Sequence, residues 1–175
     1  MSAVLRYSLI ERGNSVALSA AAIGALGAVT LAAAWAFQIW GGYIPCPLCL
    51  QQRIPYYVGV PLALIVAVAA AQWQVGASAR LGLAGIGVIF VWSAYLAGYH
   101  SGAEWQWWPG PTGCAVDAGR VTDAGGLLDQ LRSYTPVRCD EAPWRFLGLS
   151  FAGWNFVISI ALAGTAFAGA LRRPG

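Results

Sequence analysis

The stretch SVALSAAAIGALGAVTLAAAWAFQ, residues 15–38, carries no charged side chain and decides the class of the fold. It lies within a run of 40 uncharged residues between Arg12 and Arg53. About 20 apolar helical residues cross the roughly 30 Å hydrocarbon core of a bilayer, because each residue rises about 1.5 Å. The stretch therefore predicts a membrane-spanning helix. It exceeds the roughly 7–15 apolar residues of a secretory signal, so we expect it to be retained.

Three further charge-free runs have similar lengths. The uncharged residues number 26 between Arg53 and Arg80, 23 between Arg80 and Glu104, and 26 between Arg145 and Arg172. We therefore predict an all-α membrane protein, a four-helix transmembrane bundle that forms a single integral membrane domain over residues 1–175. The predicted spans cover about residues 15–38, 50–72, 81–100 and 150–171. One long outer loop covers about residues 101–149.

The composition agrees with a membrane protein. Only 10% of the residues are charged, against about 25% in a soluble domain, which is too few to keep a globular surface in water. All ten basic residues are arginine, and they are scattered along the chain. A nucleic-acid-binding protein would show a basic stripe, so we expect a lipid bilayer as partner and no nucleic acid.

The arginines also orient the predicted bundle. Four spans place both termini on one side, where the two tails and the turn at Arg80 hold five arginines in very short segments. The other side also holds five, spread over a longer stretch, together with six of the seven acidic residues. By the positive-inside rule, weighed by density in short segments, both termini are expected in the cytoplasm.

The four cysteines all lie on the predicted outer side. Cys46 and Cys49 form a CxxC in IPCPLCLQQR, residues 44–53, and Cys114 and Cys139 lie 25 residues apart in the outer loop. In a bacterium this side is the periplasm, where disulfides persist. Zinc sites favour two close pairs, or one pair with histidines. The second pair is widely spaced and the chain has one histidine, so no metal is expected.

Two interpretations of the cysteines remain open. A Cys114–Cys139 disulfide would staple the loop and contribute on the order of 3 kcal/mol, whereas a bridge closing the short CxxC adds little. Alternatively both pairs are redox-active. A CxxC at a helix start lies near the positive helix end, and Arg53 follows on the same face, which favours the reactive thiolate. The competing interpretation of Arg53 is that it snorkels to the headgroups.

Two redox pairs on one side of a membrane form a relay, because thiol–disulfide exchange passes two electrons from pair to pair. The chain has no haem-type CxxCH and no dinucleotide-binding glycine motif. A lipid-soluble quinone is therefore the simplest acceptor. His100 lies at the membrane level of the CxxC, where it is suited to bind a quinone oxygen or supply a proton; otherwise it is an interfacial histidine without a role.

Three segments carry a family resemblance. PCPLCLQQR (residues 45–53), GYHSGAEWQWWPGPTGC (98–114) and RCDEAPWRFLGLSFAGWN (138–155) resemble the bacterial disulfide-bond-formation protein B (DsbB) family in order and spacing. The resemblance runs over about residues 15–171. It implies an inner-membrane four-helix bundle that reoxidises a periplasmic thioredoxin-like dithiol oxidase (DsbA-like) and reduces ubiquinone or menaquinone, in support of protein disulfide formation.

The same resemblance implies roles for the site residues. Cys114 would accept the partner's thiolate, Cys139 would then exchange with Cys46, and Cys49 would face the quinone. Arg53 and His100 match the family's quinone-side arginine and histidine. One departure is Gln52, since many members carry an acid before the arginine. This departure and a loop of distinct composition leave the partner open, a general or a dedicated oxidase.

Two other functions are weighed against this one. A quinone reductase like vitamin K epoxide reductase also has a helical bundle, a CxxC and a loop pair, but its CxxC comes late in the chain whereas this one comes early. A non-enzymatic four-span protein with a disulfide-stapled loop would leave Cys46 and Cys49 dispensable and inert toward quinone.

Overall fold

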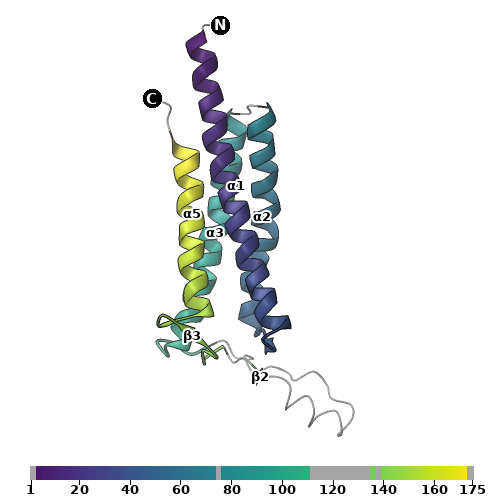
Figure 1. Cartoon of the computed structure of the whole chain (residues 1–175). Coiled ribbons are helices and arrows are strands. Elements are labelled where there is room, and N and C mark those ends of the chain that lie inside the picture. Colours follow the sequence, from purple (N-terminus) through teal and green to yellow (C-terminus); the bar gives the residue numbers. More distant parts are fainter. Residues whose placement is uncertain (1–2, 74–75, 111–134, 137–138, 173–175) are drawn as a thin grey trace.

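Four long helices run alternately up and down along one axis in the computed structural model, which describes residues 3–73, 76–110, 135–136 and 139–172 (Figure 1). They are α1 (Ala3–Ile39), α2 (Pro47–Trp73), α3 (Gly76–Glu104) and α5 (Phe151–Leu171). The parts long and apolar enough to cross a membrane are Ser15–Ile39, Pro47–Gln72, Ala77–Glu104 and Phe151–Leu171. The predicted all-α bundle of four spanning helices is confirmed, and the protein is a multi-pass membrane protein.

Helix α3 extends past the boundary near residue 100 that the sequence predicts. It ends at Glu104, the acidic residue that terminates the charge-free run. The helix uses the whole charge-free run and also includes Glu104, whose side chain is only 7% exposed and accepts a hydrogen bond from the Ser150 hydroxyl. His100 and Glu104 consequently lie one turn apart on the same helix.

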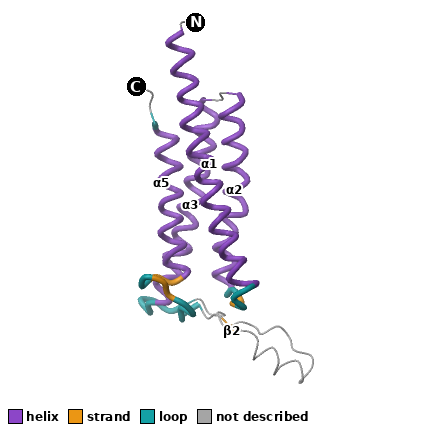
Figure 2. Tube along the Cα trace, viewed as in Figure 1, coloured by secondary structure: helices purple, strands orange, loops and turns teal. Residues whose placement is uncertain are grey.

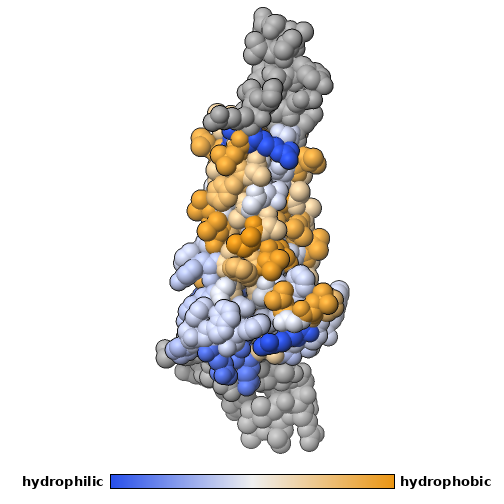
Figure 3. Space-filling view, turned by 90° about the vertical axis from the view of Figure 1, so that its left-hand side faces the viewer, coloured by the Kyte–Doolittle hydropathy of each residue, from blue (hydrophilic) through white to orange (hydrophobic). Residues whose placement is uncertain are grey.

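The helices bury a core of aliphatic and aromatic side chains. Helix α3 packs most extensively on α5, and α2 packs on α1 and α3. Ile23, Tyr56, Phe90 and Leu162 contribute to the core from the four helices in turn. The outer faces remain apolar, and Figure 3 shows a hydrophobic middle zone between hydrophilic ends. A bundle that is apolar both inside and outside is suited to hydrocarbon surroundings.

Short strands cover one end of the bundle, opposite the end at which α1 begins and α5 finishes (Figure 2). Strand β1 (Tyr43–Ile44) pairs in parallel with β2 (Thr135–Pro136). Strands β3 (Arg145–Phe146) and β4 (Leu149–Ser150) form an antiparallel hairpin. The first pairing ties the segment before Cys46 to the segment before Cys139, although the two are far apart in sequence.

Glycines allow close helix contacts in this bundle, as is usual where membrane helices pack. On α5, a Cβ added at Gly169 would lie 2.9 Å from the Cβ and Oγ atoms of Ser19 on α1 and 3.0 Å from Leu83 on α3. The same atom added at Gly164 would meet nothing within 4 Å. The two positions form a matched pair on one helix.

We expect Gly169→Ala to destabilise the bundle and Gly164→Ala to leave it unchanged or slightly more stable. Overpacking a tight contact costs about 1–3 kcal/mol, whereas alanine in an open helical position gains roughly 0.5–1 kcal/mol over glycine. Thermal unfolding in detergent, followed by circular dichroism, measures both effects. Equal midpoints for the two variants would contradict the tight contact at Gly169.

Candidate functional site

The CxxC forms the first turn of α2. Pro47 occupies the first helical position, where its fixed backbone angle is favourable and its missing N–H costs nothing. The Cys49 amide donates to the Cys46 sulfur (3.2 Å), and the Leu50 amide donates to the Cys46 carbonyl (3.1 Å). Cys46 thus caps the helix, and both sulfurs lie at its positive end, where a thiolate is stabilised.

The two sulfurs of the CxxC are neighbours. The Cys46 thiol donates to the Cys49 sulfur at 2.9 Å. Cys46 is fully buried and Cys49 half-buried. The hydrogen bond to Cys49, together with burial, raises the pKa of Cys46 to about 12. Cys46 therefore keeps its proton at neutral pH and acts as the donor within the reduced pair.

Cys139 lies beside Cys46, and both are fully buried. The sulfurs of Cys46 and Cys139 and one ring nitrogen of His100 all lie within 4.8 Å of one another. The pairing of β1 with β2 explains why the two cysteines meet, because β1 ends two residues before Cys46 and β2 ends three residues before Cys139. Cys114, the other loop cysteine, lies outside the described residues.

His100 projects from the end of α3 into this cluster. Its Nε2 atom is 3.9 Å from the Cys46 sulfur and 3.9 Å from the Glu104 carboxylate. Its Nδ1 atom is 2.6 Å from the Gln52 amide nitrogen on α2. The ring is only 2% exposed, so it lies inside the bundle rather than at the lipid surface. Its Nε2 atom faces the sulfur in either tautomer.

A chain of buried and half-buried polar side chains continues from His100 into the bundle. The Asn155 amide donates to Gln52 Oε1 (2.6 Å), and the Tyr56 hydroxyl donates to Asn155 Oδ1 (2.6 Å). Tyr56 also contacts Ser159 (3.3 Å), which donates to another buried serine, Ser93 (2.9 Å). Among the described residues no buried side-chain nitrogen or oxygen lacks a partner. This chain fixes the His100 ring through its Nδ1 atom.

The donors and acceptors along this series of hydrogen bonds can be reversed. In the order given, an amide N–H of Gln52 faces Nδ1, so Nε2 carries the ring proton toward Cys46. Amide nitrogens and oxygens are nearly interchangeable in shape. If Gln52 and Asn155 both turn over, Gln52 accepts from Nδ1, and Nε2 presents a lone pair. The chain therefore supports His100 as a proton donor or as a base and ligand.

Arg53 lies outside this cluster, although the sequence places it on the CxxC face. Its guanidinium donates to the Gln38 side chain (2.6 Å) and the Ala34 carbonyl (3.2 Å), both on α1. It also lies over the Trp35 ring, 5.2 Å from the ring centre. Arg53 is thus a half-buried cation held between α1 and α2, with an aromatic ring beside it.

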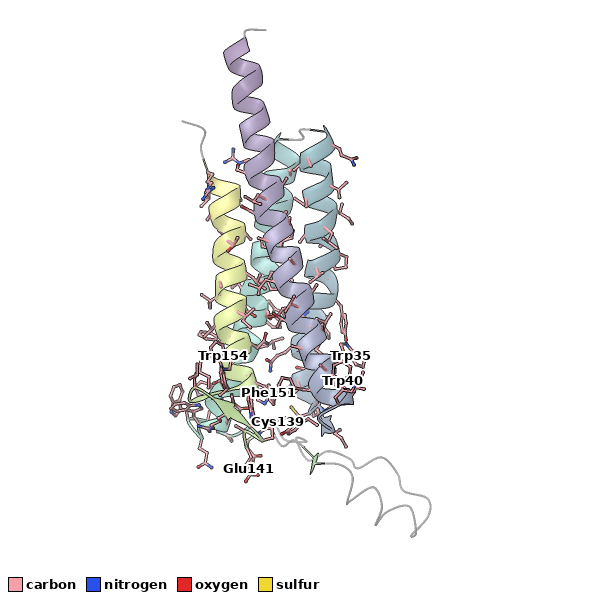
Figure 4. The ribbon with its side chains drawn as sticks, viewed as in Figure 1. Trp35, Trp40, Cys139, Glu141, Phe151 and Trp154 are labelled. Carbon is pink, nitrogen blue, oxygen red and sulfur yellow. The ribbon has the colours of Figure 1, made fainter. Side chains whose placement is uncertain are left out.

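Figure 4 shows the labelled side chains Trp35, Trp40, Cys139, Phe151 and Trp154 at the same end of the bundle. The structure brings Cys46, Cys49, Cys139 and His100 together at this end. Sequence reasoning missed Gln52, Tyr56 and Asn155 as site neighbours. The signal was present, since polar side chains four residues apart inside apolar spans are costly unless they face the bundle interior.

Comparison with known proteins agrees with this geometry. Residues 16–169 match the family described as disulfide bond formation protein DsbB. The chain belongs to the DsbB family. DsbB-family proteins are oxidoreductases of disulfide bond formation, and the family predicted from the three sequence segments is confirmed.

Curated members of the DsbB family resemble the chain over most of its length. Disulfide bond formation protein B of Polaromonas sp. is 30% identical over 70% of this chain and 71% of its own. The proteins of that name from Saccharophagus degradans and Methylococcus capsulatus are 33% and 30% identical, covering 79% and 77% of this chain and 82% of theirs. No solved structure matches the chain.

The proximity of Cys46 to Cys139 makes a direct prediction. In the Cys49→Ser/Cys114→Ser double variant these two cysteines alone remain, and a mild thiol oxidant should join them rapidly. Mass spectrometry of unreduced peptides detects the bridge. The same variant unfolded in sodium dodecyl sulfate is the control, since the two positions are then separated by a long flexible chain. Equal rates in both states would contradict the observed cluster.

Proposed function

We propose that this protein is a thiol:quinone oxidoreductase that reoxidises a periplasmic DsbA-like dithiol oxidase. The overall reaction converts a dithiol and a quinone into a disulfide and a quinol, with two electrons and two protons transferred. Family membership supports the reaction class. The observation that carries the proposal is the buried meeting of Cys139 with Cys46, because it joins the loop pair to the CxxC.

The proposed relay begins at the loop pair. A thiolate of the partner attacks Cys114 in the Cys114–Cys139 disulfide, and Cys139 leaves as a thiolate. Cys139 then attacks Cys46 in the Cys46–Cys49 disulfide, and Cys49 leaves as a thiolate at the positive end of α2.

The remaining exchanges restore the loop pair. The partner's second thiolate closes the partner disulfide and releases Cys114. Cys114 then displaces Cys46 from its bond to Cys139. The loop disulfide is restored, and the reduced CxxC holds the two electrons.

Quinone, as ubiquinone or menaquinone, would accept these two electrons while the Cys46–Cys49 disulfide reforms. The surroundings of Arg53 fit such a substrate. Its guanidinium has five N–H donors, of which the contacts with Gln38 and Ala34 use two. Exposed aromatic side chains, Trp35 and Tyr57, lie beside it at the lipid-facing surface. Arg53 would bind the substrate oxygen and stabilise developing negative charge.

His100 has a proton-handling role in this proposal. Its Nε2 atom faces Cys46, and the reversible chain through Gln52 lets the ring donate or accept a proton there. Because the ring is buried beside the cysteines, its contacts support a role beside Cys46 more directly than a contact with the substrate ring.

The bundle would lie in a bacterial inner membrane with both termini in the cytoplasm and the cysteines facing the periplasm. The arginine distribution supports this orientation. A membrane-impermeant maleimide applied to intact spheroplasts should label reduced Cys114 but not a cysteine introduced by Ser2→Cys. The reverse labelling pattern would overturn the orientation.

Quinone reduction by the purified protein is the decisive test of the proposed reaction. With a reduced DsbA-like partner and a soluble quinone analogue, the absorbance of the quinone should fall catalytically. Cys49→Ala should abolish turnover because the electrons then have no outlet. Gly164→Ala, at an open position on α5, is the matched control and should retain turnover. Undiminished turnover in Cys49→Ala would refute the relay.

Removal of the Arg53 guanidinium should affect the quinone half of the reaction alone. Loss of one charge-stabilising donor typically lowers the rate by roughly 10²–10³-fold, so Arg53→Ala should slow quinone reduction or raise its KM. Formation of the mixed disulfide with the partner should keep its wild-type rate. Gln38→Ala removes one contact that holds Arg53 and should act in the same direction more weakly. An unchanged quinone titration would leave Arg53 as a membrane-surface anchor.

A further inference from the structure

Three side chains at the outer end of the bundle form a set of metal ligands that sequence spacing does not reveal. Cys46 comes from the start of α2, His100 from the end of α3, and Cys139 from the loop before β3. The three side chains are 0%, 2% and 0% exposed. Thiolates and imidazole are the ligands that Zn²⁺ and related borderline-soft cations prefer.

The distances are close to those of a tetrahedral centre. Zinc lies about 2.3 Å from sulfur and 2.0–2.1 Å from nitrogen, which separates neighbouring ligand atoms by roughly 3.5–3.8 Å. The Cys46 sulfur and His100 Nε2 are 3.9 Å apart. The whole set lies within 4.8 Å, so an inward movement of at most about 1 Å would close it around a cation.

Two neighbours strengthen the site. Gln52 holds the His100 ring at Nδ1. With the amide turned over, its oxygen accepts a hydrogen bond from the Nδ1–H group and leaves Nε2 free to coordinate. Such a partner on the second ring nitrogen is the usual support of a metal-bound histidine. The Glu104 carboxylate lies 3.9 Å from Nε2, where it adds negative charge or occupies a fourth position.

We propose that the reduced protein binds one divalent cation of the Zn²⁺ type through Cys46, Cys139 and His100. Binding releases the two thiol protons to solvent and involves no electron transfer. Two thiolates balance the charge of the cation, which lowers the cost of burying it in a low-dielectric site. The oxidised protein would not bind, because a disulfide removes the thiolate ligands.

The cation would act as a reversible brake on the relay. While it holds both sulfurs, Cys46 is unable to bond to Cys49 and Cys139 is unable to bond to Cys114. This consequence rests on the proposed function, whereas the binding itself does not. The site would thus hold the protein in its reduced state when free Zn²⁺ rises.

Cobalt titration tests the binding directly, because Co²⁺ reports tetrahedral thiolate ligation in its visible and near-ultraviolet absorption. The reduced protein in detergent should bind one Co²⁺, which Zn²⁺ displaces, and the oxidised protein should bind none. Cys139→Ser and His100→Ala should each abolish the tetrahedral spectrum. Gln52→Ala should weaken affinity roughly 10–100-fold. Cys114→Ser is the matched cysteine control and should bind as the wild type does.

Two results would overturn the proposal. One is the absence of a tetrahedral spectrum in the reduced wild-type protein. The other is an unchanged spectrum in Cys139→Ser and His100→Ala, which would assign the metal to the CxxC alone. Melting curves establish that each variant is folded, and Gln52→Ala keeps all three ligands if His100→Ala unfolds.

An activity measurement separates this proposal from the proposed function. Wild-type turnover should proceed in a metal chelator and fall at least tenfold when Zn²⁺ is added to the reduced protein. Turnover without any cobalt binding would refute the metal site and leave the relay standing. Cobalt binding without quinone reduction would refute the relay and leave the metal site standing.

Discussion

The need to satisfy every buried polar group inside a hydrocarbon solvent shapes this molecule. Tyr56, Asn155 and Ser159 lie within helices apolar enough to span a membrane. The hydrocarbon core of a bilayer holds no water, so an unpaired hydroxyl or amide there would cost several kcal/mol. These side chains therefore bond to one another across α2 and α5. This series of hydrogen bonds ends at His100 and holds the His100 ring in one orientation against Cys46. The same hydrogen bonds therefore stabilise the bundle and position the residues of the site.

The helices were predictable because one constraint governs them. A charged side chain inside a bilayer is costly, so the distances between charges measure the spans almost directly. The one clear difference lies at the end of α3, which continues from the predicted end near residue 100 to Glu104. Glu104 is an acidic residue, but the hydroxyl of Ser150 donates a hydrogen bond to it inside the bundle. A prediction from charge alone does not account for hydrogen-bond partners that come from a distant part of the sequence.

Candidate residues of the site were identifiable from the sequence, but their arrangement was not. The CxxC spacing places Cys46 and Cys49 on one turn, since helix geometry fixes neighbours within a segment. Cys139 approaches Cys46 because β1 pairs with β2. Strands of two residues are too short to leave a recognisable sequence pattern, so this pairing was not predictable. The direction of Arg53, toward Gln38 on α1, depends on helix rotation. The spacing argument against zinc has the same weakness, because ligands from three elements leave no spacing motif.

The placement of the cysteines also follows from their chemistry. Exchange between pairs requires two sulfurs in contact, and burial keeps other thiols from intercepting them. Burial in turn disfavours the thiolate, and it helps to keep the Cys46 pKa near 12. The positive N-terminal end of α2 offsets this effect of burial for the Cys49 sulfur, the leaving group of the proposed relay. The helix end stabilises negative charge without exposing it to water. A helix N-terminus, a held histidine and a neighbouring sulfur would thus allow the proposed thiol relay to work inside a closed bundle. The same combination of buried soft ligands, Cys46, Cys139 and His100, would hold the proposed metal ion once the cysteines are reduced.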